Sequence, residues 1–267
     1  MVEPVERDSR GILHPGEGLR RFELTRFPPS AGVGRFVDRY WLVSWDLTGT
    51  YEQHVLAHPV VNVVFEVSGG TVNGVQTERF TRQLSGRGRA LGVMFRPGGF
   101  RPFLGRALAT ITDTVHPVVD EFPALHPAEP ALVEALRNGT GGAEIAELAD
   151  DALAGLVPDA RHPAEDTIAL AELAAKKRDL RRVEDLAALA GTSVRALQRA
   201  FHDHVGVGPK WVLRRYRLYD AAERAARAEA VDWAALAVDL GYADQAHLTR
   251  EFTSVVGEPP ARYARRS

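Results

Sequence analysis

The 267-residue sequence contains no cysteine. Disulfide bonds, thiolate metal sites and cysteine nucleophiles are therefore excluded, and the composition suits a reducing compartment. Long apolar runs are also missing, since none approaches the roughly 18 to 20 residues that span a bilayer. Residues 1–20 mix charges with proline and glycine and lack the apolar stretch of a signal peptide. We therefore expect a cytoplasmic protein with no membrane contact.

A strong net charge is absent as well. The formal net charge is −2, and residues 165–267 carry 17 Lys and Arg against 15 Asp and Glu. This balance excludes a protein that coats nucleic acid through bulk positive charge. The hydrophobic content of 45% is that of a globular protein with a sizeable core. Any recognition of nucleic acid must therefore come from specific motifs.

The first hundred residues show the two-residue period and β-branched content of strands. Short strands are expected over 35–46, 60–67, 71–75, 79–84 and 89–96, with glycines between them. In the first of these, alternation places Val37, Trp41, Val43 and Trp45 on one face. Several short strands with frequent glycine turns predict an antiparallel β-sandwich or small barrel.

Beyond Gly105 the apolar spacing becomes helical, with helices expected at about 131–157. Their apolar stripe either packs on the β-domain or forms a homodimer interface. The sequence thus predicts an α+β protein of two domains. These are a β-rich sensing or dimerisation domain with a helical tail (1–158), a linker (159–164) and an all-α domain (165–267).

The all-α domain contains an internal repeat with an offset of 51 residues. In the first copy the repeated positions are Leu197, Arg199, Phe201, Gly206 and Pro209, and in the second they are Leu248, Arg250, Phe252, Gly257 and Pro260. A glycine suited to positive φ precedes each copy, at Gly191 and Gly241. Ser193 and Asp244 then provide N-caps for the next helix. Each copy therefore predicts a helix-turn-helix unit.

The second helix of each unit has a polar outer face. Residues Arg195, Gln198, Arg199 and His202 form this face in the first copy, and Gln245, His247, Thr249 and Arg250 form it in the second. Arginine can form two hydrogen bonds to guanine and glutamine two to adenine in the major groove. Between the copies, a helix expected over 210–229 offers Arg214, Arg215 and Arg217 to phosphates. Ser193 is a further predicted phosphate contact.

Residues 165–267 resemble the DNA-binding domain of the AraC/XylS family of bacterial transcription regulators. The resemblance is carried by the spaced residues of both copies and by Arg217 and Ala221 between them. It implies recognition helices at 193–204 and about 244–255. The base-reading positions that it implies are Arg195, Ala196, Gln198, Arg199, Gln245, Ala246, Thr249 and Arg250. Family members commonly place a cupin-like sensing domain first, which the β-rich region fits.

The N-terminal region offers weaker candidates. Trp41 and Trp45 either line a ligand pocket or belong to the core. Arg96 and Arg101 flank a glycine turn, where they either hold an anionic effector or lie in solvent. His54 and His58, followed by Glu66, lack the His-x-His spacing of a metal cupin. We therefore predict no metal, no cofactor and no catalytic residue.

Three functions fit these observations. The first is a transcription regulator, and not an enzyme, that binds a double-stranded DNA operator under control of a small-molecule effector. The second is a constitutive DNA-binding regulator whose N-terminal domain only dimerises or contacts RNA polymerase. The third is a metal-dependent cupin enzyme fused to a DNA-binding module. The repeat supports DNA binding in all three.

Overall fold

The computed structural model describes residues 11–177, 179–227 and 231–266. Its N-terminal part contains one antiparallel sheet with the strand order β1-β2-β5-β3-β4-β6. The strands are β1 (Phe22–Phe27), β2 (Val37–Val55), β3 (Asn62–Glu66), β4 (Gly69–Asn73), β5 (Phe80–Phe95) and β6 (Val115–Pro117). Short helical segments α1 (Pro15–Gly18), η1 (Val33–Arg35), α2 (Arg101–Leu104), η2 (Leu108–Ile111), α3 (Val118–Glu121) and η3 (His126–Ala128) surround it. The predicted antiparallel β-domain is confirmed, but its strands form one open sheet rather than the predicted sandwich or small barrel.

Strands β2 and β5 form the long antiparallel pair at the centre of this sheet, and β5 differs from the two strands predicted for its residues. The strands predicted at 79–84 and 89–96 are one continuous strand, because Gly86 and Gly88 lie inside the ladder rather than in a turn. Gly86 has a φ of 59° and lies beside a register shift in β2. A glycine within a strand is typical of a bulge or of a close approach by another group.

A second register shift changes which side of the sheet the side chains of β2 point to. The ladder slips between Val37 and Arg39, so that Val37 joins Tyr40 and Leu42 in the buried core. Trp41 and Val43 face the opposite side of the sheet. The single face predicted for Val37, Trp41 and Val43 is therefore wrong at Val37, because one extra residue reverses the alternation.

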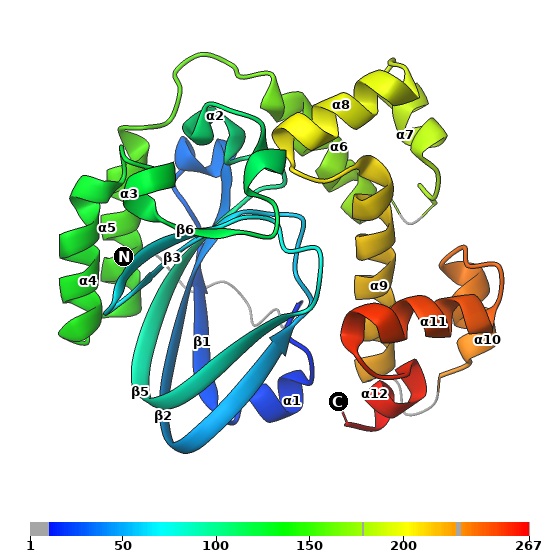
Figure 1. The fold of residues 1–267 in the computed structure, drawn as a ribbon, viewed down its shortest axis with the longest axis horizontal. Coiled ribbons are helices and arrows are strands. Elements are labelled where there is room, and N and C mark those ends of the chain that lie inside the picture. Colours follow the sequence, from blue (N-terminus) through cyan, green and yellow to red (C-terminus); the bar gives the residue numbers. More distant parts are fainter. Residues whose placement is uncertain (1–10, 178, 228–230, 267) are drawn as a thin grey trace.

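Helices α4 (Glu129–Arg137) and α5 (Gly142–Ala154) cover one face of the sheet, away from the C-terminal helices (Figure 1). Leu132 and Leu136 of α4, and Ile145 and Leu153 of α5, are fully buried in the same core as the strands. The apolar stripe therefore packs on its own β-domain, one of the two alternatives predicted for it.

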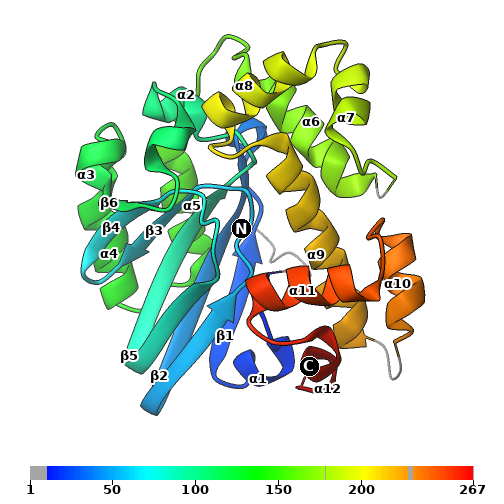
Figure 2. The same cartoon turned by 45° about the vertical axis from the view of Figure 1, so that its right-hand side comes forward.

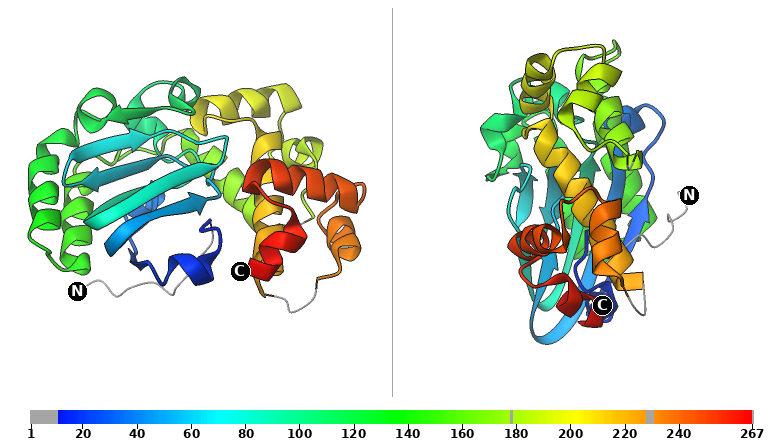
Figure 3. Two further views of the ribbon diagram at one scale, coloured as in Figure 1. Left: turned by 60° about the horizontal axis from the view of Figure 1, so that its bottom comes forward. Right: turned by 90° about the vertical axis from the view of Figure 1, so that its right-hand side faces the viewer.

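The C-terminal part contains helices joined by turns and loops, and no strand among its described residues. It comprises α6 (Ala164–Lys176), α7 (Val183–Leu189), α8 (Val194–His204), α9 (Pro209–Arg227), α10 (Trp233–Asp239), α11 (Gln245–Val256) and α12 (Pro260–Arg266). Helix α9 runs between the pair α7–α8 at one end and the pair α10–α11 at the other (Figures 1 and 2). All of these helices lie on the side of the sheet opposite α4 and α5 (Figure 3).

Candidate nucleic-acid interface

The first helix-turn-helix unit consists of α7 and α8, joined by a tight turn. Gly191 has a φ of 61°, which a residue with a side chain rarely adopts. The Ser193 hydroxyl accepts a hydrogen bond from the Ala196 amide at 3.2 Å and caps α8. The helix predicted at 193–204 is thus observed over Val194–His204, with the predicted cap.

The second unit, formed by α10 and α11, repeats this construction. Gly241 has a φ of 74°. The Asp244 carboxylate accepts a hydrogen bond from the His247 amide at 2.6 Å and caps α11. The helix ends at Gly257, whose φ of 92° is that of a C-terminal glycine cap. The same short rule of glycine, cap and apolar spacing therefore produces both units.

The inner faces of the two helices are buried in separate cores. Leu197 and Phe201 of α8 pack with Leu186 of α7 in one cluster. Leu248 and Phe252 of α11 pack with other residues in a second cluster. Helix α9 contributes to both clusters and connects them. Each unit therefore has its own apolar support.

The outer faces carry the predicted base-reading residues. Six of these residues are exposed, namely Arg195, Gln198, Arg199, Gln245, Ala246 and Arg250. Ala196 and Thr249 are half-buried. None of these eight residues is buried in a hydrophobic core, so a ligand outside the protein can contact their side chains.

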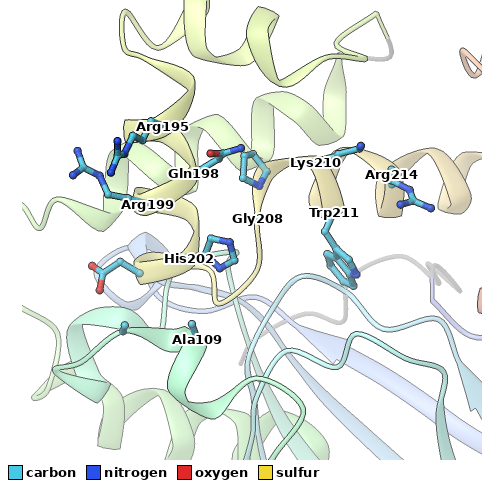
Figure 4. A pocket seen from close by; sticks show the side chains of 12 residues that line it. Ala109, Arg195, Gln198, Arg199, His202, Gly208, Lys210, Trp211 and Arg214 are labelled. Atoms are coloured by element: carbon cyan, nitrogen blue, oxygen red, sulfur yellow. The ribbon is translucent and has the colours of Figure 1, made fainter.

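A broad hollow of about 880 Å³ lies in front of α8 (Figure 4). Its wall includes Arg195, Gln198, Arg199 and His202 from α8, Lys210, Trp211 and Arg214 from α9, and Ala107 and Ala109 from the N-terminal domain. Within the described residues, Arg195, Arg199 and Lys210 form no ion pair. The hollow is therefore rich in cations that are available to an anionic ligand.

Lys210 is a candidate that the sequence prediction missed. It lies in the first turn of the 19-residue helix α9, where the backbone amides and the helix dipole favour an anion. The predicted helix over 210–229 already began at this lysine, and Pro209 at the first position of α9 is typical of a helix start, so the signal for an anion contact was present in the sequence.

Two of the three arginines predicted to contact phosphates face inward. Arg215 is only 2% exposed, and its Nη2 donates a hydrogen bond to the Thr77 carbonyl at 2.7 Å. Burial lowers the pKa of Arg215. Arg217 is half-buried with its guanidinium over the ring of Tyr242, 5.2 Å from the centroid. The N-terminal domain covers that side of α9 in this structure, so the phosphate role predicted for Arg215 stays a prediction that requires the two domains to separate.

Arg214 remains about half-exposed and contacts a buried acid that the sequence prediction also missed. Its Nη2 lies 3.0 Å from the carboxylate of Glu251, whose side chain is 5% exposed. The hydrogen bond to Glu251 raises the pKa of Arg214, and burial raises the pKa of Tyr242, which donates a hydrogen bond to the same carboxylate. Glu251 thereby fixes Arg214 of α9 against α11. Nothing in the spacing distinguishes it from an exposed acid.

The two arginines predicted to hold an anionic effector form ion pairs with the C-terminal domain instead. Arg96 pairs with Glu172 of α6, and Arg101 pairs with Asp203 of α8 at 3.2 Å. Neither is among the residues that line the N-terminal cavity. Of the two alternatives predicted for Arg96 and Arg101, an anionic effector or solvent, neither is what they contact here, because their charges are compensated at the contact between the two domains.

Trp41 and Trp45 line a cavity of about 560 Å³ on the open face of the sheet. Their assignment to a pocket, rather than to the core, is the alternative that agrees with the geometry.

The His58 ring stacks on Tyr219, and His54 hydrogen-bonds with Thr81. Among the described residues, no group of three or more His, Cys, Asp or Glu is placed to hold a metal ion. In the same residues, no helix has the length and hydropathy needed to cross a membrane.

Comparison with known proteins identifies two regions of the chain. Residues 25–117 match a domain of unknown function (DUF6597), and residues 186–266 match a helix-turn-helix domain. The second match spans both units described above. Among curated proteins, no sequence matches the chain.

Solved structures of ToxT from Vibrio cholerae are similar to the chain over most of its length. An apo variant of ToxT aligns with a TM-score of 0.40 and 13% identity, covering 98% of this chain and 99% of that chain. Wild-type ToxT bound to an unsaturated fatty acid aligns with a TM-score of 0.38 and 12% identity, covering 91% of each chain. At these values the alignments support no transfer of individual residues. Residues 186–266 therefore form a helix-turn-helix domain, in agreement with the resemblance to the DNA-binding domain of AraC-type transcription regulators, and residues 25–117 form a domain of unknown function.

Proposed function

We propose that the protein binds one specific double-stranded DNA operator by placing α8 and α11 in successive major grooves. The observation that carries this proposal is the matched construction of the two units. Each has a glycine turn, a capped second helix, a buried inner face and an exposed polar outer face. Successive major-groove faces are about 34 Å apart, and the rigid helix α9 fixes the separation of the two units.

Base recognition is assigned to the outer faces of α8 and α11. The guanidinium groups of Arg195, Arg199 and Arg250 can each form paired hydrogen bonds with guanine. The side-chain amides of Gln198 and Gln245 can do so with adenine. The small side chains of Ala196, Ala246 and Thr249 suit contact with a thymine methyl group.

Phosphate contacts are assigned to the rim of these faces. Ser193 lies at the N-terminus of α8, and Lys210 and Arg214 lie along the hollow in front of it. The unpaired ammonium of Lys210 and the amides of the first turn of α9 favour the same anion. Arg214 is held by Glu251 in a fixed position, which reduces the entropy lost on binding.

These assignments give each of the two domains a separate role. We assign DNA binding to residues 165–267 and sensing to residues 1–158, with 159–164 as the linker. The cavity beside Trp41 and Trp45 favours control by a small-molecule effector over a constitutive regulator. A homodimer and a contact with RNA polymerase are compatible with this arrangement.

Two substitutions test the recognition helices. With an operator selected from the host genome, Arg199→Ala and Arg250→Ala are each expected to weaken binding by about 1–3 kcal/mol and to relax specificity at one base pair. Arg87→Ala is the matched control, because this exposed arginine lies on the N-terminal sheet. Fluorescence anisotropy against single-base operator variants measures both effects. Unchanged affinity and specificity in Arg199→Ala would remove α8 from the interface.

A third substitution tests the phosphate contacts. Lys210→Ala is expected to weaken binding to every DNA sequence equally, because the ammonium contacts the backbone rather than a base. The slope of log affinity against log salt concentration should fall by about 1. Lys177→Ala, at an exposed lysine beyond the end of α6, is the control and should leave the slope unchanged. A selective loss at one sequence would contradict a phosphate role.

A further inference from the structure

The cavity in the N-terminal domain has features of a binding site beyond its size. At about 560 Å³ it falls in the range of small-molecule sites. Side chains of β1 to β5 line it, on the sheet face opposite the main core. Most of the lining side chains are apolar, among them Leu24, Val43, Val64 and Met94.

The floor of this cavity contains two indole rings that lie against glycines of the neighbouring strand. In the ladder, Trp41 is opposite Gly92, and Trp45 is opposite Gly88. A Cβ atom at Gly92 would lie 1.9 Å from the Trp41 ring, and one at Gly88 would lie 2.2 Å from the Trp45 ring. The indoles therefore lie flat across β5, and any side chain at either glycine would displace them.

The polar atoms of both indoles are already used by the protein. Trp41 Nε1 donates a hydrogen bond to Asn62 Oδ1 at 3.3 Å, and Trp45 Nε1 donates to the Ser85 carbonyl at 3.2 Å. The ring faces, rather than the N–H groups, are thus presented to a ligand. Such faces favour stacking with another planar ring.

The charges around the cavity are compensated within the protein. Arg82 pairs with Glu66, and Arg39 pairs with Asp38 at 2.6 Å. Arg26, the remaining arginine of the lining, is buried and also has an interaction partner. A charged ligand would have to displace one of these partners. The lining therefore favours an uncharged molecule.

Two segments of the cavity wall also touch α9 or α11. His58 lines the cavity, and its ring stacks on Tyr219 of α9 with 4.4 Å between centroids. The Tyr219 hydroxyl donates a hydrogen bond to the carbonyl of Leu56, in the same segment. In the second segment, Phe80 lines the cavity while the preceding Arg79 donates to the Val256 carbonyl of α11 at 3.4 Å.

From these contacts we infer that the cavity binds an uncharged, planar aromatic molecule of two or three rings, and that its occupancy shifts α9 through His58 and Tyr219. This inference rests on the proposed function, since its readout is the affinity of the two units for DNA. A ligand that stacks on the indoles meets His58 at the wall. Movement of His58 changes the contact that orients the helix between the two units.

Binding to the cavity can be tested with the neutral probe N-phenyl-1-naphthylamine. Its fluorescence should rise on binding, with energy transfer from tryptophan. The double variant Val43→Phe/Val64→Phe fills the cavity and should weaken probe binding at least tenfold. Val67→Phe/Val238→Phe makes the same change at two exposed positions and should leave it unaltered. Equal binding by the filled variant would overturn the assignment.

A second measurement does not depend on the folding of a variant. In the wild-type protein, 1-anilinonaphthalene-8-sulfonate should compete for the cavity at least tenfold more weakly than the neutral probe that it displaces, because the sulfonate finds no uncompensated cation in the cavity lining. Equal or tighter binding of the sulfonate would overturn the uncharged class of ligand.

The coupling to DNA is tested by operator affinity with and without saturating N-phenyl-1-naphthylamine. The probe should change the affinity of the wild-type protein at least fivefold, as expected for coupling between two sites. His58→Ala should retain probe binding but lose this change. Specific operator binding without any effect of a bound probe would overturn the coupling and leave the proposed function intact. Absence of specific operator binding both without and with the bound probe would instead reject the proposed function.

Discussion

Replacing Phe252 with alanine is expected to lower the stability of the second helix-turn-helix unit by about 3–5 kcal/mol, the usual cost of removing a buried phenyl ring. Phe252 is fully buried in the cluster that holds α10, α11 and α12 together. Its ring packs edge-on against Tyr263, with 5.5 Å between centroids. Local unfolding free energies within a domain range from near zero to the global value, so a loss of this size opens the unit.

The effect should stay within that unit, because the two units have separate cores. Hydrogen exchange followed by mass spectrometry should show faster exchange in α10 to α12 and unchanged exchange in α7 and α8. Phe201→Ala is the matched control, since Phe201 is equally buried in the other cluster and should give the reverse pattern. Equal acceleration in both units, from either substitution, would mean that they unfold as one body.

The two units were predictable from the sequence because short-range rules determine them. Gly191 and Gly241 supply the positive φ of each turn, Ser193 and Asp244 cap the next helix, and the apolar spacing decides which face is buried. These rules act within about ten residues of chain. The bounds of α8 and α11 consequently differ from prediction by a single residue.

The sequence prediction failed where the surroundings of a side chain depend on a segment that is distant in the sequence. Taken alone, Gly88 of β5 resembles a turn residue. In the structure its missing side chain leaves room for the ring of Trp45, which belongs to a strand some 40 residues earlier. Likewise, Arg96 and Arg101 resemble solvated arginines until their partners on α6 and α8 are known. Local propensity contains no information about such partners.

Arg215 shows the same limit, and the expected effects of replacing it follow from its surroundings. It is nearly inaccessible, and its guanidinium lies over Trp211 at 4.4 Å from the ring centroid. The Thr77 carbonyl that accepts its hydrogen bond belongs to a residue held in turn by Asp113. Arg215 therefore connects α9 to the N-terminal domain. Its substitution should change stability rather than the charge that DNA meets.

Two substitutions at this position separate the hydrogen bond from the packing. Arg215→Met retains most of the side-chain volume and should cost about 1 kcal/mol, for the lost hydrogen bond to Thr77. Arg215→Ala also removes the packed stem and should cost about 2–5 kcal/mol more. Denaturant unfolding measures both values.

The dependence of DNA affinity on salt then distinguishes this buried arginine from a phosphate contact. A residue that neutralises a phosphate contributes about 0.9 to the slope of log affinity against log salt concentration. Because Arg215 is covered by the N-terminal domain, Arg215→Met should leave that slope at its wild-type value, whereas Lys210→Ala should reduce it. A reduced slope in Arg215→Met would mean that the domains separate on DNA and expose this side of α9. The arginine would then exchange the Thr77 carbonyl for a phosphate.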